Sequence, residues 1–303
     1  LAPVGLYKTN ARTVWSTVRE DQVLQRSLST WVQNDIRWSS WFRSVAGLRA
    51  DAYAFAVASS LSANSGKAND QMLSPKLSLI FGPWRKTELY LNYGHGFHSN
   101  DARGTTITVD PNDPSVAVAK VKPLVRTQGL EAGLRSEILP GWQSTLSLWQ
   151  LNSVSELLFV GDAGTTEPSR PSHRYGVEWT NFVTLSRKLA FDADIAWSHA
   201  RFRDQAVEGN HIPGAMTATA NVGISLSRLG PWSGALRVRY FGPRPLIENN
   251  SIRSAGSTLS NLRIGYQLAP RTQLMLDVYN LFNRKVNDIE YWYASQLRGE
   301  STP

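Results

Sequence analysis

Residues 73–104 read LSPKLSLIFGPWRKTELYLNYGHGFHSNDARG, and this stretch decides the fold. Apolar and polar residues alternate on both sides of a short turn at residues 82–86, with the apolar positions at Leu73, Leu77, Leu79, Phe81, Leu89, Leu91, Tyr93 and Phe97. A period of two residues predicts β-strands with one apolar and one polar face. After Phe97 the sequence becomes polar as far as Gly104. The stretch therefore predicts a β-hairpin that is tightly closed at one end and opens into a long polar loop at the other.

The same hairpin unit recurs along most of the chain. The alternation predicts about 13 strands, at residues 1–13, 24–38, 41–57, 73–81, 89–97, 124–138, 145–160, 175–183, 189–197, 216–226, 236–240, 262–268 and 274–278. Within 41–57 the apolar positions change phase between Ala50 and Tyr53, which predicts a β-bulge. No segment has a convincing helical pattern.

Short and long connections alternate between these strands. Tight turns are expected near residues 39, 84, 140, 187, 230 and 270, and longer loops at 61–70, 98–123, 161–172, 203–213 and 243–255. Trp84, Trp142 and Trp232 each stand at a tight turn, where an aromatic girdle would meet the periplasmic interface. We therefore predict an all-β fold, an antiparallel transmembrane β-barrel with short periplasmic turns and long extracellular loops. A soluble β-sandwich is the alternative, but it would rarely keep this alternation over six hairpins.

Composition narrows the class of protein further. The chain has no cysteine, which excludes disulfides and thiolate sites. Its mean hydropathy is −0.29, and it has no apolar run of about 18 residues, so a transmembrane helix is excluded. The net charge of +8 allows a basic surface for anionic solutes, a nucleic-acid partner, or a charge balanced elsewhere in a larger protein. Because the 32 Lys and Arg are scattered and not clustered, we expect no nucleic-acid partner.

Four segments of the chain resemble one known family. They are residues 73–104, RTQGLEAGLR at 126–135, YGVEW at 175–179 and DVYNLFN at 277–283. Because these segments occur in this order within the recurring hairpins, the chain is similar to the C-terminal part of the β-barrel of TonB-dependent outer-membrane receptors. The similarity extends over essentially all 303 residues.

The resemblance implies the architecture of a larger protein. The family's barrel has about 22 strands and is filled by an N-terminal plug domain. Residues 1–303 would then form a single domain, a partial barrel, with the plug, its TonB-contacting box, the early strands and the closing strand absent from this sequence. Tyr90, Glu131 and Asp194 are expected to face the lumen, where they would contact a plug.

The resemblance also implies a function in the bacterial outer membrane. It implies TonB-coupled uptake of a scarce solute, most readily a ferric siderophore or similar metal chelate, with haem, cobalamin and carbohydrates as other family substrates. The implied partners are the TonB complex through the plug, outer-membrane lipid and lipopolysaccharide, and the small-molecule substrate. We expect a monomer without a cofactor, in which a metal chelate would be the transported ligand. A passive porin-like or structural barrel is the alternative.

No combination of residues predicts an enzyme or a metal site. His95, His98 and Asp101 are potential metal ligands, but their spacing matches no recognised ligand set. Ser172 precedes His173 and Ser198 precedes His199, and a barrel that hydrolyses lipid would need a serine and a histidine. No G-x-S-x-G or other nucleophile signature surrounds either serine.

The basic and polar residues in or beside the long loops are the candidate ligand-binding residues. Arginine suits the bidentate capture of carboxylate or phosphate-like groups on an anionic chelate. The same arginines would alternatively bind lipopolysaccharide or pair with loop acids such as Asp101 and Asp162. The candidates are His98, Asp101, Arg103, Arg126, Arg170, His173, Arg174, Arg203, His211, Arg244 and Arg253.

Overall fold

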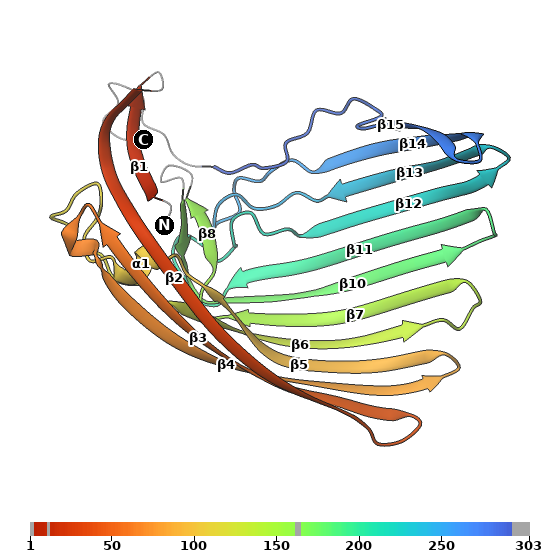
Figure 1. Ribbon diagram of the computed structural model, residues 1–303, viewed down its shortest axis with the longest axis horizontal. Helices are drawn as coiled ribbons and strands as arrows, with labels where there is room; N and C mark the ends of the chain where they lie inside the picture. Colours follow the sequence, from red (N-terminus) through yellow and green to blue (C-terminus); the bar gives the residue numbers. More distant parts are fainter. Residues whose placement is uncertain (1–2, 11–12, 161–164, 293–303) are drawn as a thin grey trace.

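The computed structural model describes residues 3–10, 13–160 and 165–292. Their main feature is one 13-stranded antiparallel sheet in which each strand pairs with its neighbours in chain order (Figure 1). Its strands are β1 (Pro3–Asn10), β2 (Thr13–Arg37), β3 (Phe42–Ser59), β4 (Gly66–Trp84), β5 (Thr87–Ser99), β6 (Leu124–Ser136), β7 (Trp142–Ser153), β10 (Ser172–Thr184), β11 (Leu189–Phe202), β12 (Ala218–Leu229), β13 (Trp232–Phe241), β14 (Ser257–Ala269) and β15 (Thr272–Val278). The predicted all-β fold and number of strands are confirmed.

Three small elements lie in the loops. A separate two-stranded sheet pairs β8 (Leu157–Val160) with β9 (Thr165–Pro168). The helical elements of the described residues are the 3-10 turn η1 (Ser62–Asn64) and the short helix α1 (Ala102–Thr106). Among the described residues no helix is long and apolar enough to cross a membrane.

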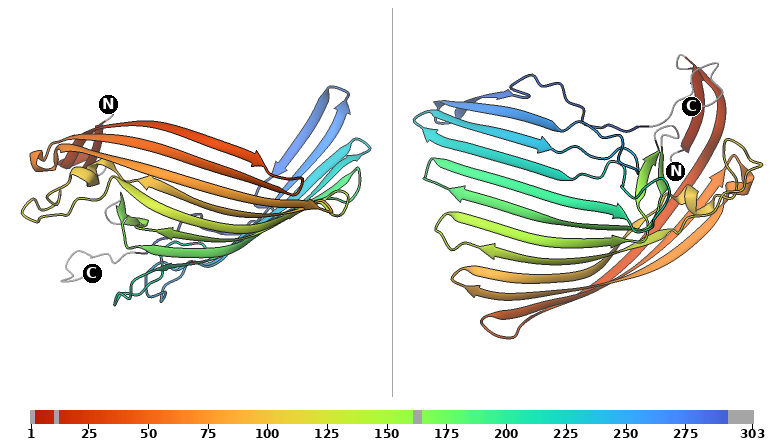
Figure 2. Two further views of the ribbon diagram at one scale, coloured as in Figure 1. Left: turned by 90° about the horizontal axis from the view of Figure 1, so that it is seen from below. Right: turned by 180° about the vertical axis from the view of Figure 1, so that it is seen from behind.

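The six predicted tight turns all lie at one end of the sheet, and the long connections lie at the other (Figure 1). Two further views show that the sheet is strongly curved and that α1 sits at the long-loop end (Figure 2). The β4–β5 hairpin closes through Arg85 and Lys86, which both have positive φ, 49° and 61°. Such a two-residue turn matches the right-handed twist of the strands that it joins. We call this end the turn end and the other the loop end.

One face of the sheet is apolar and exposed across neighbouring strands. Leu91 of β5 lies opposite Ala132 of β6, which lies opposite Leu148 of β7, and the row continues to Val177 and Trp197. Leu148 and Trp197 are 56% and 48% exposed. An exposed apolar face of this extent is the surface that a barrel presents to lipid. We call it the apolar face.

The opposite face carries polar side chains that pass over glycines. Tyr90 crosses Gly133, its direct neighbour on β6, and donates a hydrogen bond to Glu131 Oε1 at 3.1 Å. Asp192 of β11 and Arg237 of β13 reach each other at 3.0 Å across Gly223 of β12. We call this the polar face. It carries Tyr90, Glu131 and Asp194, as the alternation predicted.

The predicted bulge in residues 41–57 is wrong. The registers of β3 with β2 and with β4 run without a break. The phase change has another cause: Phe55 and Val57 point to the polar face, where Ala102 of α1 covers them. The side of the strand that is buried therefore changes along β3, while the strand itself stays regular.

Several predicted boundaries also need correction. β2 begins at Thr13, about a dozen residues earlier than expected, and β4 begins at Gly66, inside the predicted loop 61–70. The predicted strand 145–160 divides into β7 and β8, and β9 lies in the predicted loop 161–172. These segments lie at the loop end, where the alternation of apolar and polar residues stops and periodicity gives no boundary.

Candidate functional site

The candidate ligand-binding residues all lie at the loop end, but the structure divides them into separate groups. Ladder hydrogen bonds carry β10 and β11 up to Ser172 and Phe202, which lie opposite each other. The loop that joins β11 to β12 folds back and buries Ile212 and Ala215 against Ala200 and Phe202. The β11–β12 loop is therefore packed against the sheet and not free.

The first group forms around Glu156, on the polar face. Its carboxylate accepts hydrogen bonds from Arg174 Nε and Nη2 at 2.9 and 2.8 Å, and from the hydroxyl of Ser172. The Glu156 side chain is only 13% exposed. Arg174 was predicted as a ligand contact, whereas Glu156 and Ser172 were not. In this arrangement Arg174 joins β10 to the segment that follows β7.

Arg170 lies in the same region and also has partners. Its guanidinium stacks 4.1 Å from the centre of the Phe202 ring and lies 3.5 Å from Asp204 and 3.2 Å from Glu208. Nη2 donates to the carbonyl of Gly209 at 2.7 Å. The cation therefore anchors the β11–β12 loop.

The second group lies at α1. Asp101 caps the helix by accepting from the Arg103 backbone N–H, and it binds the Arg103 guanidinium at 2.9 and 2.8 Å. Burial raises the pKa of Asp101, but the hydrogen bonds and charge of Arg103 outweigh this effect, so that the pKa lies below its ordinary value. Asn64 fixes the following segment, because its Oδ1 accepts from the N–H groups of Thr108 and Val109 at 2.8 and 3.0 Å.

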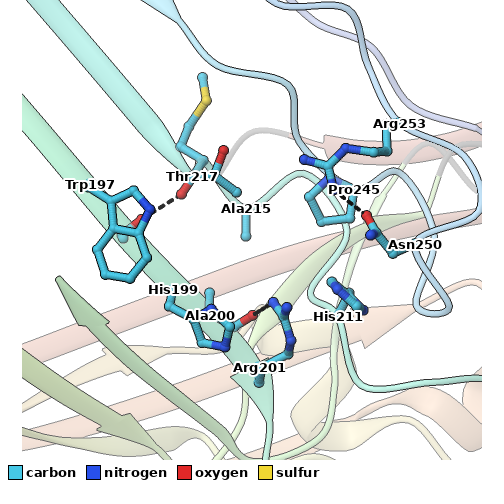
Figure 3. A pocket seen from close by; sticks show the side chains of 12 residues that line it. Trp197, His199, Ala200, Arg201, His211, Ala215, Thr217, Pro245, Asn250 and Arg253 are labelled. Atoms are coloured by element: carbon cyan, nitrogen blue, oxygen red, sulfur yellow. Dashed lines mark hydrogen bonds between the residues drawn. The ribbon is translucent and has the colours of Figure 1, made fainter.

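The third group surrounds a cavity of about 130 Å³ between β11 and the loops on either side of β12 and β13 (Figure 3). It contains the predicted residues His211 and Arg253, and also His199 and Arg201, which the sequence analysis did not select. Arg201 lies opposite His173 on β10 and opposite His211 in the loop. The strand prediction ended at residue 197, so it did not follow the apolar-face positions of β11 as far as Arg201.

The other candidates are not brought together. Arg126 lies within β6 and contacts His95 Nδ1 at 2.7 Å, and the N–H of Arg244 donates to Ser254 Oγ at 3.1 Å. Arg203 is exposed. His98 is the last but one residue of β5, and none of the residues that the structure describes forms a hydrogen bond with its buried Nε2.

The serine and histidine pairs considered for catalysis do not form hydrogen-bonded pairs. Ser172 and His173 are adjacent in β10 and so point to opposite faces. Ser172 bonds to Glu156, and Ser198 Oγ donates to the carbonyl of Met216 at 2.5 Å. Among the described residues, no group of three or more His, Cys, Asp or Glu side chains is placed to hold a metal ion.

Comparison with models of protein families gives a match over almost the whole sheet. A family model described as "TonB dependent receptor-like, beta-barrel" matches residues 3–281. A comparison with curated proteins finds no match.

Solved structures share the fold at low sequence identity. The copper transporter OprC aligns at 20% identity with a TM-score of 0.67, over 90% of this chain and 44% of that one. The ferric-catecholate import receptor Fiu from Escherichia coli K12 aligns at 13% identity with a TM-score of 0.69, over 89% and 42%. The ferric yersiniabactin uptake receptor FyuA from Yersinia pestis aligns at 18% identity with a TM-score of 0.70, over 88% and 42%. The chain thus spans somewhat over two fifths of the length of these proteins.

Proposed function

We propose a function from the premise that this chain belongs to the TonB-dependent receptor family, as part of its β-barrel. The proposed function is uptake of a ferric siderophore or similar metal chelate across the bacterial outer membrane by TonB-coupled active transport. The observation that carries this proposal is the family match over residues 3–281, which covers the whole sheet up to β15. The energy coupling and the substrate belong to the longer protein of which this chain would be a part.

The dimensions of the sheet support placement in a membrane. A transmembrane β-strand needs roughly 9–11 residues. The strands β5–β7 and β10–β14 have 10 to 14 residues. Their apolar face is exposed, and Trp142 and Trp232 stand at the turn end, where an interfacial aromatic girdle belongs.

The choice of a metal chelate rests on two observations. The structural relatives named above are described as a copper transporter and as receptors for ferric-catecholate and ferric yersiniabactin. The loop end of this chain also retains cations without a carboxylate partner among the described residues, including Arg203 and Arg244. Arg170 and Arg174 are instead neutralised by carboxylates, so we assign them to holding the loops and not to the substrate.

Uptake by cells that express the complete reading frame tests the proposal. The frame on both sides of residues 1 and 303 would be sequenced, and the encoded protein expressed in a strain without its own ferric-chelate receptors. We expect accumulation of radiolabelled iron from a ferric siderophore, and loss of this accumulation when an uncoupler removes the proton gradient. Accumulation that survives the uncoupler would establish a passive barrel and refute the proposed mechanism.

Substitutions at the loop end then test the substrate contacts. Replacing either Arg203 or Arg244 with alanine is expected to raise the concentration of chelate needed for half-maximal uptake by about tenfold, because each single change removes one charge-assisted contact. Arg187→Ala is the matched control, because Arg187 is an exposed arginine in a turn at the opposite end of the sheet. Equal effects at both ends would refute the assignment of the loop-end arginines.

A further inference from the structure

The cavity in Figure 3 lies at the edge of the apolar face. Side chains alternate along β11, so Ile195, Trp197, His199 and Arg201 point to the same side. Ile195 and Trp197 belong to the exposed apolar face, being 41% and 48% exposed. His199 and Arg201 therefore continue that face toward the loop end, away from the polar face on which Arg170 and Arg174 lie.

The cavity has an excess of positive and ionisable nitrogen groups. His199, Arg201, His211 and Arg253 line it together. Arg201 donates to the carbonyl of its neighbour Ala200 at 2.8 Å. Arg253 donates to Asn250 Oδ1 and to the carbonyl of Pro243, at 2.5 and 3.0 Å.

No carboxylate of the described residues pairs with either arginine. Asp204 and Glu208, which lie in the same loop as His211, form ion pairs with Arg170. Burial and the charges of Arg201 and Arg253 lower the pKa of His211, although its contact with the Glu248 carbonyl acts in the opposite direction. Cations that line one cavity without a counter-charge repel each other, and a bound anion would relieve this repulsion.

The cavity also has the size and the donors that a tetrahedral oxyanion needs. Its volume of about 130 Å³ is roughly ten times the 10–15 Å³ that one water molecule requires. Guanidinium groups donate in a planar fork that matches phosphate oxygens. The amide of Asn250 and the hydroxyl of Thr217 complete a polar lining.

Aromatic side chains on the turn-end side of the cavity indicate its depth in the membrane. The ring of Tyr175 lies 6.1 Å from that of Trp197 and 5.1 Å from that of His199. Tyr and Trp collect at the boundary between hydrocarbon and headgroups. The cavity extends from these rings toward the loop end, so it would open at the level of the lipid headgroups.

We propose that this cavity binds a phosphate group of a membrane lipid in the outer leaflet, with Arg201 and Arg253 as the principal donors. The proposal relies on the outer-membrane placement in the proposed function but not on transport. It distinguishes Arg170 and Arg174, which carboxylates neutralise on the polar face, from Arg201 and Arg253, which line the cavity and bind lipid.

Native mass spectrometry of the intact outer-membrane protein in detergent tests the proposal. The probes are lipid A, its dephosphorylated derivative and inorganic phosphate. We expect lipid A to remain bound, the dephosphorylated derivative to bind at least tenfold more weakly, and millimolar inorganic phosphate not to displace lipid A. Displacement by inorganic phosphate, or equal retention of the dephosphorylated lipid, would overturn the lipid-phosphate assignment.

Variants locate the site within the protein. Arg201→Gln and Arg253→Gln are each expected to weaken lipid A binding about tenfold, because each removes charge-assisted hydrogen bonds to phosphate. Arg187→Gln, at the turn end, is the control and should bind as the unaltered protein does. Unchanged binding by the double variant would refute the site. Normal iron uptake by a double variant that has lost lipid binding would separate this proposal from the transport function.

Discussion

The contact of Tyr90 with Gly133 provides a sharp test of how the polar face is built. A Cβ atom on residue 133 would lie 2.1 Å from Cζ and 2.3 Å from the hydroxyl of Tyr90. Carbon atoms in contact normally lie about 3.5–4.0 Å apart. Gly133→Ala must therefore displace the Tyr90 ring by more than about 1 Å.

The expected cost follows from what the displaced ring loses. Tyr90 donates to Glu131 Oε1 at 3.1 Å, and a hydrogen bond to a charged group contributes about 1.5–3 kcal/mol. Because Tyr90 and Glu131 are only partly buried, the lower part of this range applies. Displacement of the ring also removes packing, so we expect Gly133→Ala to lower the free energy of unfolding by about 2 kcal/mol.

A double-mutant cycle isolates this contact from any general effect of alanine in a strand. Tyr90→Ala removes the ring, and in that background Gly133→Ala no longer meets an obstacle. The free energy of unfolding would be measured by urea titration of the protein refolded in detergent micelles, followed by far-UV circular dichroism. In the Tyr90→Ala background, we expect Gly133→Ala to leave the free energy of unfolding nearly unchanged, or to raise it because alanine restricts the unfolded backbone more than glycine does. If Gly133→Ala costs the same in both backgrounds, the reasoning is refuted.

Two further predictions concern the turn end and the loop end. Trp142 donates its indole N–H to Oδ1 of the buried Asn181 at 3.1 Å. Trp142→Phe should therefore lower the free energy of unfolding by about 1–2 kcal/mol, whereas Trp232→Phe should lower it by less. Equal losses for the two variants in urea titration would contradict this prediction. The pKa of Asp101 is depressed in the folded protein, so its contact with Arg103 is fully present above the ordinary aspartate pKa of about 3.9 and is lost as the pH falls through the lower folded value. Protection of the Arg103 amide against hydrogen exchange should therefore persist at pH 4, and its loss near pH 5 would contradict the assignment.

The sheet could be predicted from sequence because its signal is local. A strand that faces lipid on one side and water on the other must alternate, and the segment 73–81 shows this directly. Arg85 and Lys86 close the hairpin where the apolar alternation stops and resumes. The tight turns were therefore located correctly.

The pattern failed where a distant segment covers the polar face. Phe55 and Val57 are apolar because Ala102 packs on them, and nothing within residues 41–57 indicates that contact. A β-bulge and a change of buried side produce the same change of phase in a sequence. Only the unbroken registers of β3 distinguish the two.

The sequence predicted which types of residue stand at the candidate site, but not which carboxylates the arginines pair with. Arginines in predicted loops were identified, yet Arg174 joins Glu156 across 18 positions, and Arg170 joins Glu208 across 38. Pairings of this kind depend on how the loops fold, which alternation does not encode. Arg201 was missed for a related reason: β11 continues to Phe202, after its apolar positions have given way to His199 and Arg201.

The two faces of β10 and β11 explain why charge alone was a poor guide to function at the loop end. On β10, Arg174 points to the polar face, where Glu156 neutralises it, while its neighbour His173 points to the apolar face opposite Arg201. The same short segment therefore supplies a structural ion pair on one side and, on the other, a histidine that lies opposite the unpaired Arg201. A count of arginines treats these positions as equivalent. The register of the strands separates them, and it places Arg201 and the proposed lipid-phosphate site on the apolar face.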